Sequence, residues 1–491
     1  MGPAVWLFAV TCVVAALSST PGWVPVHFDE AQYASWLIDP ALSYQTKGPL
    51  VTFTQSLIEG LALPPLVAMR LPAWVAFLVS GLALLWVGCR AGLREAQLWV
   101  LALSLSGAPL VMLLAMVHTT DIWLFAMILV SLGAFAEVVH CDGRQGAEIW
   151  WVCMGFALGL GALAKLSIAL IPLALFPWVV LRMPHILLTA GPYLGAAVCA
   201  LIMSPWIAWN LDHDFAHFKH EFGHVARGAG DWTDVISWLP IMVFSVLPVG
   251  WLAVFGGLDW RKTRDRLHEL GFALRVREAF QVASAVLVLF FVLKGLAGPI
   301  LINWVLPLVP FLLLGFAARV RWGVSTQGVV TAVQWVLVLA VLFPYTLGWT
   351  MQRDAFQKIR GWDAAIQEAA ALAGPTAVLS TDHYSVLAWA LFYWPERADE
   401  GRWDDPTGQV IPESTRRLNH YDRWAVLAQP HERVIHLGAS PPEALRARCG
   451  QLSFLGDVAV RMPDGAVRST FGVWECLAFA PTPPWPAMDR H

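Results

Sequence analysis

The sequence has little charge. Only 14% of its 491 residues are Asp, Glu, Lys or Arg, and 57% are hydrophobic, whereas a typical soluble protein has about 25% charged and roughly 45–50% apolar residues. A soluble protein this apolar could not cover its core with polar side chains. The composition therefore excludes the disordered, coiled-coil and collagen-like classes and predicts a polytopic α-helical membrane protein.

An excess of basic residues is also absent. The 32 Lys and Arg are balanced by 35 Asp and Glu, for a net charge of −3, so no basic surface for nucleic acid is expected. The seven cysteines include no CxxC pair, which excludes a zinc ribbon or a thioredoxin-like redox motif. Only Cys449 and Cys476 share a polar region, and in an oxidising compartment they could form a disulfide; the sequence leaves that question open.

Long apolar runs recur through the first 350 residues. No Lys or Arg precedes the first run and no persuasive cleavage site ends it, so we interpret it as a retained helix rather than a signal peptide. Crossing a bilayer takes roughly 17 to 25 apolar residues. By this criterion we expect about eleven transmembrane helices, at 1–18, 64–89, 96–117, 122–139, 149–164, 166–181, 186–209, 235–257, 280–297, 300–318 and 325–349.

The polar segments between these runs alternate in charge. Every second one is rich in basic residues, and the positive-inside rule places short loops of this kind in the cytoplasm. The other loops, at 19–63, 118–121 and 210–234, and everything after about residue 350, are therefore expected on the outer face of the membrane. The basic set comprises Arg90, Arg94, Arg144, Arg182, Arg261, Lys262, Arg264, Arg266, Arg275, Arg277, Arg319 and Arg321.

The last part of the chain has a different pattern. Charges, turns and short apolar runs alternate there, with helical periodicity at 362–373 and 386–392. We therefore predict two domains: a transmembrane domain at 1–350, whose first outer loop at 19–63 carries juxtamembrane helices, and a small soluble α/β domain at 351–491 on the outer face.

Several ionisable residues fall at the predicted outer boundary of the membrane, where charge is costly and suggests function. Asp29 and Glu30 follow the first helix, although a helix N-terminus would also favour carboxylates there. Lys47 lies on a tight turn, but a lone lysine near a membrane commonly extends its amine to the interface. Asp121 opens a helix and has the same N-capping alternative.

Two further cations, Arg70 and Lys165, lie inside or between apolar runs. A buried cation needs a partner, and we expect either a carboxylate such as Asp29 or Asp121, or a phosphate group of a ligand.

Taken together, in their order and spacing, short segments along nearly the whole chain resemble a family. They are similar to the bacterial polyprenyl-phosphate-sugar-dependent glycosyltransferases of the membrane GT-C fold, a group that includes the aminoarabinose transferases of lipid A and is related to protein O-mannosyltransferases. The segments are His27-Phe-Asp-Glu-Ala-Gln-Tyr33, Thr46-Lys-Gly-Pro-Leu50, Arg70-Leu-Pro72, Thr120-Asp121, Gly161-Ala-Leu-Ala-Lys165, Trp209-Asn-Leu-Asp-His-Asp214, Asn303-Trp304, Asp382-His-Tyr384, Ala390-Leu-Phe-Tyr-Trp394 and Arg416-Arg-Leu-Asn-His-Tyr-Asp-Arg-Trp424.

The resemblance implies a reaction and its carboxylates. A sugar would move from a polyprenyl phosphate to an extracytoplasmic lipid or glycan acceptor, such as lipid A, lipopolysaccharide or another envelope glycan, with inversion at the anomeric carbon. Asp29 matches the family's catalytic carboxylate, Glu30 its neighbour, and Asp121 the second carboxylate that helps position substrates.

The resemblance also implies which cations meet the donor phosphate. Lys47 matches the phosphate-contacting lysine, and Arg70 and Lys165 are weaker candidates. Two positions depart from the aminoarabinose transferases: Thr46 replaces an acidic residue that can contact a metal, and Gly48 replaces a proline. A metal at that position is therefore doubtful, and the donor sugar cannot be carried over.

A competing signal is the segment from His220 to His224, a literal HExxH that on a helix could hold zinc. A membrane zinc peptidase is therefore one alternative function, and a transporter or lipid flippase is another. No cofactor is expected to be required; a divalent cation held by His217, His220 or His224 in support of the transferase is a separate hypothesis.

Overall fold

The computed structural model describes residues 2–142, 146–225, 232–237, 239, 271–320, 323–374, 378–394, 408–410 and 430–480. Packing divides the chain into two compact units. The first, here called the helical unit, comprises Met1–Leu17, Leu71–Leu211 and Phe218–Leu339. The second, here called the sheet unit, comprises Ser18–Arg70, Asp212–His217 and Ala340–His491.

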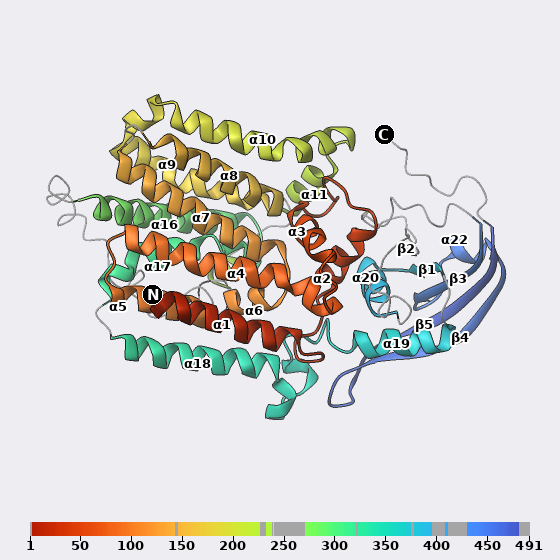
Figure 1. Cartoon of the computed structure of the whole chain (residues 1–491). Coiled ribbons are helices and arrows are strands. Elements are labelled where there is room, and N and C mark those ends of the chain that lie inside the picture. Colours follow the sequence, from red (N-terminus) through yellow and green to blue (C-terminus); the bar gives the residue numbers. More distant parts are fainter. Residues whose placement is uncertain are drawn as a thin grey trace. The chain divides into compact units, whose positions relative to one another are not determined.

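Long apolar helices make up the helical unit, and several run side by side (Figure 1). Some of them extend by a few residues into the sheet unit. The described helices of this unit, including short 3-10 segments (η), are α1 (Gly2–Ser19), α4 (Pro65–Arg90), α5 (Glu95–Gly107), α6 (Pro109–Met116), α7 (Thr120–Cys141), α8 (Glu148–Ala164), η2 (Leu166–Ala169), α9 (Leu170–Arg182), η3 (Pro184–Leu188), α10 (Gly191–Asp212), α11 (Ala216–Val225), α12 (Trp232–Ser237), α16 (Phe272–Ala297), η4 (Ile302–Val305), α17 (Leu308–Phe316), η5 (Ala317–Arg319) and α18 (Val324–Leu342).

Each predicted apolar run contains helix in its described part, with short breaks in some runs, and most of the run at 235–257 lies outside the described residues. Within the described residues, six helices are long and apolar enough to cross a membrane, or seven if the bent pair α5 and α6 forms one span. The others are shorter, such as α8 with 17 residues and α9 with 13. The polytopic helical class is confirmed, and the count of eleven spans is not.

Helix α7 lies at the centre of the helical unit, with 89% of its apolar window buried, against 22% for α10 and for α18. Its 22 residues measure about 33 Å at 1.5 Å per residue, close to the roughly 30 Å hydrocarbon thickness of a bilayer. Asp121 is at its N-terminal end. At its C-terminal end Glu137 binds Arg90 and Asp142 binds Arg275. The basic residues and Asp121 therefore lie at opposite ends of this helix.

The sheet unit combines segments that are distant in sequence. Its elements are α2 (Phe28–Ser35), η1 (Trp36–Ile38), α3 (Leu50–Glu59), η6 (Pro344–Leu347), η7 (Met351–Arg353), α19 (Trp362–Ala373), β1 (Val378–Thr381), α20 (Tyr384–Tyr393), β2 (Gly408–Val410), β3 (His431–Gly438), α22 (Glu443–Arg446), β4 (Cys449–Arg461) and β5 (Val467–Phe479).

The five strands form one mixed sheet in the order β2-β1-β3-β5-β4. Strand β1 pairs in parallel with β2 and with β3, in a register that sets Ser380 beside His436. Strands β3, β5 and β4 pair antiparallel, and a tight turn around Gly465 joins β4 to β5. The small C-terminal sheet and its two predicted helices are thus present.

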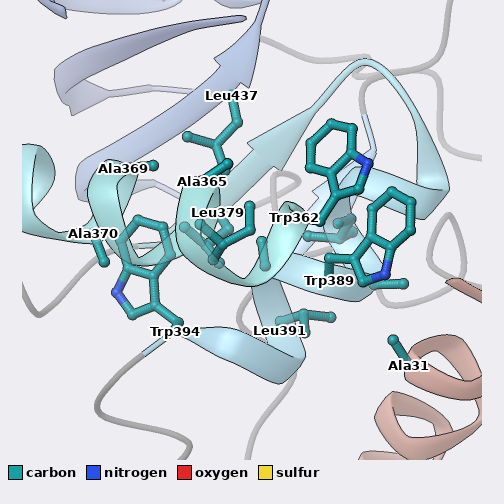
Figure 2. Packing of buried hydrophobic residues seen from close by; sticks show 14 of the residues in the cluster. Ala31, Trp362, Ala365, Ala369, Ala370, Leu379, Trp389, Leu391, Trp394 and Leu437 are labelled. Atoms are coloured by element: carbon teal, nitrogen blue, oxygen red, sulfur yellow. The ribbon is translucent and has the colours of Figure 1, made fainter. Parts of the chain in front are cut away.

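A stack of aromatic rings forms the core of this unit (Figure 2). Trp362 of α19 stacks on Trp389 of α20 with ring centroids 4.6 Å apart, and on Phe471 of β5 at 5.8 Å. Ala31 of α2 belongs to the same buried cluster. The first loop after α1 therefore shares a hydrophobic core with the C-terminal sheet.

A disulfide joins Cys449, the first residue of β4, to Cys476 of β5, with their Cα atoms 5.4 Å apart. This is the pair that the sequence left open. The other five cysteines are free thiols.

We predict that removing this bond destabilises the sheet unit. Because the bond closes a 27-residue separation, Cys476→Ser should lower stability by about 3 kcal/mol, through the greater freedom of the unfolded chain. Thermal unfolding of the purified protein in detergent measures the effect.

Exposed Cys12 provides the matched control, and Cys12→Ser should unfold like wild type. Mass-tagging of thiols in the denatured protein should count five without reductant and seven with it. Seven tags without reductant would contradict the disulfide.

Candidate active site

Asp29 lies in the first turn of α2. The helix begins with a capping box: the backbone N–H of Asp29 donates to Nδ1 of His27 at 3.1 Å, and the N–H of His27 donates to Glu30 at 3.1 Å. The Asp29 carboxylate takes no part in the cap. Its Oδ2 lies 3.9 Å from Nζ of Lys47 and 3.9 Å from Nδ1 of His27, with 21% of the side chain exposed. Asp29 and Lys47 are therefore adjacent and accessible.

The turn that carries Lys47 is held by Tyr44. The Tyr44 ring stacks on Trp36 at a centroid distance of 3.9 Å, its N–H donates to the carbonyl of Lys47 at 3.2 Å, and its hydroxyl accepts from the N–H of Ala41 at 3.1 Å. A ring nitrogen of His217 lies 3.0 Å from the Tyr44 carbonyl oxygen. These contacts fix the backbone from which the lysine extends.

Glu30 and Arg70 form a fully buried ion pair. Nε and Nη2 of Arg70 donate to the two carboxylate oxygens of Glu30 at 3.0 and 2.9 Å. The remaining guanidinium hydrogens bond to main-chain carbonyls: Nη1 donates to Ser18 at 2.6 Å and Val24 at 3.2 Å, and Nη2 to Pro25 at 3.2 Å.

An arginine has five N–H donors, and those of Arg70 make five bonds within the protein. The sequence predicts a carboxylate, such as Asp29 or Asp121, or a ligand phosphate as the partner of this cation; the structure provides a carboxylate, that of Glu30. This geometry suits positioning of the loop before α2 better than contact with a substrate.

Asp121 and Lys165 are bonded to each other in the helical unit. Nζ of Lys165 donates to Oδ1 of Asp121 at 2.8 Å, and Nδ2 of Asn303 donates to Oδ2 at 2.9 Å. Lys165 follows the end of α8 in an extended conformation, and Thr119, not Asp121, occupies the N-cap of α7. The carboxylate therefore makes tertiary contacts in place of the N-cap that was the simpler alternative.

In each unit, some residues that contact these groups have no role assigned from the sequence. In the helical unit, Asn303 belongs to one of the motifs without a role of its own, and its bond to Asp121 joins positions 182 residues apart. Trp389 donates from Nε1 to the carbonyl of Val26 at 3.0 Å and meets the edge of the Phe28 ring at 5.9 Å. Tyr384 meets Phe28 edge-on at the same distance. Two residues of α20 thus border the segment that carries Asp29.

The histidine motif lies on helix α11, as an HExxH site requires. His217 is buried against Tyr44 and His220 is half-buried. The side chain of His224 lies outside the described residues, so the cation site of His217, His220 and His224 stays a prediction.

Comparison with known proteins shows the fold and the proteins that this chain resembles. Residues 46–209 match the family model described as "Dolichyl-phosphate-mannose-protein mannosyltransferase". The chain is also similar to ArnT of Cupriavidus metallidurans. Against the apo structure it has a TM-score of 0.57 and 16% identity, covering 96% of this chain and 98% of that one. Against the structure bound to undecaprenyl phosphate the values are 0.56 and 15%, over 98% and 99%. The fold is that of a GT-C glycosyltransferase.

A curated relative adds a more particular likeness. The chain is 24% identical over 384 residues to the lipid A galacturonosyltransferase RgtD of Rhizobium johnstonii, covering 74% of this chain and 76% of the relative. The resemblance to the bacterial polyprenyl-phosphate-sugar-dependent GT-C glycosyltransferases is confirmed.

We predict that the Glu30–Arg70 pair contributes stability. Arg70→Met should lower the free energy of unfolding by about 3–5 kcal/mol, because it leaves a buried carboxylate uncompensated. Lys47→Met, which removes a longer and partly exposed ion pair, should cost less than about 1 kcal/mol.

Thermal unfolding in detergent compares the two variants. Equal loss of stability in Arg70→Met and Lys47→Met would rule out the structural role given to Arg70.

Proposed function

We propose that this protein is an inverting glycosyltransferase that moves a sugar from a polyprenyl phosphate to a hydroxyl group of an extracytoplasmic acceptor. The observation that carries the proposal is the pair of Asp29 and Lys47: an accessible carboxylate and an accessible amine 3.9 Å apart, on two segments that the surrounding structure holds in place.

The pair has the two charges that the reaction needs. The acceptor oxygen attacks the anomeric carbon as the bond from that carbon to the phosphate oxygen breaks. Asp29 accepts the proton of the attacking hydroxyl, a step that typically contributes 10²–10⁴-fold, by an order-of-magnitude estimate. Lys47 stabilises the negative charge that develops on the leaving polyprenyl phosphate. Attack opposite the phosphate inverts the anomeric centre without a covalent sugar–enzyme intermediate.

Donor and acceptor classes are supported by the relatives. One ArnT structure holds undecaprenyl phosphate, and the curated relative is named a lipid A galacturonosyltransferase. We therefore infer a polyprenyl-phosphate sugar as donor and lipid A, or another envelope glycan, as acceptor. A hexuronic acid is the first sugar to test, since the curated relative is named a galacturonosyltransferase.

The inferred location is the bacterial inner membrane, with the sheet unit in the periplasm. The disulfide between Cys449 and Cys476 supports it, because structural disulfides persist in oxidising compartments. The arginines at the C-terminal end of α7 support the same orientation, because the positive-inside rule places them in the cytoplasm.

We propose that Asp121 orients a substrate, whereas Asp29 acts as the base. Its charge is partly neutralised by Lys165 and one of its oxygens accepts from Asn303, an arrangement that favours orienting a substrate over accepting a proton. Lys165 is accordingly a positioning residue in this proposal, as is Arg70 for Glu30.

We predict that Asp29→Asn reduces transfer by about 10²–10⁴-fold, because the amide cannot accept the proton. The assay uses proteoliposomes with purified lipid A and undecaprenyl phosphates carrying galacturonic acid, mannose or aminoarabinose, and detects glycosylated lipid A by mass spectrometry. NMR of the product reports the anomeric configuration.

Exposed Asp39, in the same outer loop, supplies the matched control, and Asp39→Asn should retain wild-type activity. Full activity in Asp29→Asn would show that Asp29 is not the general base. Flux of the donor lipid across the membrane with no glycosidic product would favour a flippase.

We predict that Lys47→Met lowers kcat by about 10²–10³-fold, the loss expected when one preorganised group facing a developing oxyanion is removed. Lys47→Arg should retain part of the activity because it keeps the charge. Exposed Lys358→Met, in the sheet unit, is the control.

A donor with a better leaving group, such as a sugar on a nitrophenyl phosphate, should reduce the defect of Lys47→Met. An equal defect with both donors would argue against a role at the leaving phosphate.

A further inference from the structure

The corner between β1 and α20 contains Asp382, His383 and Tyr384, none of which the proposed reaction uses so far. It follows the carboxyl end of β1, which lies between β2 and β3 in the sheet. The chain leaves β1 through α20 towards β2, and β3 lies on the other side. In open α/β sheets, ligands bind outside the carboxyl ends of the strands where the strand order reverses in this way.

A buried hydrogen bond and a close side-chain contact lie behind Asp382 at this corner. Oγ of Ser380 lies 3.1 Å from Nδ1 of His436, and Nε2 of His436 lies 3.3 Å from Oδ1 of Asp382. Ser380 and His436 are fully buried, whereas a third of the Asp382 side chain is exposed. A side chain at Gly438 would collide with the Asp382 carboxylate. Because Gly438 has no Cβ, the Asp382 carboxylate can occupy this position.

The same three residues do not form a hydrolytic triad that could act on a ligand. A nucleophilic serine must reach its substrate, and Ser380 is fully buried. The partly exposed Asp382 carboxylate, 3.3 Å from Nε2 of His436, is therefore the group of the three that can meet a ligand.

Tyr384 connects this corner to the loop of Asp29. Its ring meets Phe28, the neighbour of Asp29, edge-on at 5.9 Å, and the Trp389–Val26 hydrogen bond holds α20 against the same loop. Burial raises the pKa of Tyr384, and the negative charge of Asp29 raises it further. The phenol therefore stays protonated and offers an O–H donor near Asp29.

We propose that Asp382 and Tyr384 bind hydroxyl groups of the acceptor carbohydrate and so place its nucleophile at Asp29. Sugar hydroxyls can donate to a carboxylate and accept from a phenol. The Asp382 carboxylate would repel the donor phosphate, which assigns the corner to the acceptor. This assignment rests on the function proposed above and adds a contribution of the C-terminal sheet to specificity.

The test measures initial rates with lipid A as the varied acceptor and undecaprenyl-phosphate galacturonic acid at saturation, or whichever sugar donor proves active. We expect Asp382→Asn to raise the KM for lipid A about tenfold, and Tyr384→Phe to raise it about three- to tenfold, as expected for loss of one charged and one neutral hydrogen bond. The KM for the donor should change less than about twofold in both.

Two exposed residues supply matched controls, Asp363→Asn on α19 and Tyr193→Phe on α10, and both should keep the wild-type KM for lipid A. Ser380→Ala distinguishes a structural effect from loss of a ligand contact. It removes the buried hydrogen bond to His436 and should lower thermal stability, but it should raise the KM for lipid A less than Asp382→Asn does.

Failure of this assignment can be told from failure of the proposed function. If wild type transfers sugar and both variants keep the wild-type KM for lipid A, or if the KM for the donor rises instead, the assignment is overturned and the function stands. If wild type transfers no sugar, the affinity for lipid A measured in detergent still tests the assignment. An unchanged affinity for lipid A in Asp382→Asn overturns the assignment, and a weakened affinity supports it.

Discussion

The buried ion pair between Arg70 and Glu30 is the interaction on which the rest of the candidate site depends. Taking two charges out of water costs several kcal/mol per ion unless each finds well-placed partners. Here the guanidinium binds both oxygens of Glu30 and three main-chain carbonyls. The capping box of α2 then uses a Glu30 oxygen again, through the N–H of His27. One arginine thus fixes the chain on both sides of Asp29 and leaves that carboxylate outside the network.

A similar division between support and chemistry recurs elsewhere. Tyr44 holds the turn whose lysine extends towards Asp29, and Ser380 and His436 hold Asp382. In each place the supporting groups are buried and the supported group is partly exposed. Rigid backing of this kind is what keeps a functional side chain near a productive geometry.

The sequence predicted most elements but few of the contacts between them. The helix at 362–373 agrees with α19 residue for residue, because its apolar periodicity is local. The apolar run at 96–117 predicts one helix. In the structure the helix bends by 61° before Pro109, because the proline ring and its missing N–H disfavour a continuous helix there. Asp29 and Lys47 were found because both lie in one loop, whereas the bond from Asn303 to Asp121 depends on tertiary packing that no local pattern reveals.

The hydrogen bond from Trp389 to Val26 joins residues 363 positions apart. During synthesis the loop of Asp29 is made early, but the helix that packs against it follows several hundred residues later. At about 5–20 residues per second, the loop waits roughly 20 to 70 s for this partner. The nascent chain therefore inserts its first helices before the loop of Asp29 can take its final form, and that loop gains its last packing partner only once α20 has been made.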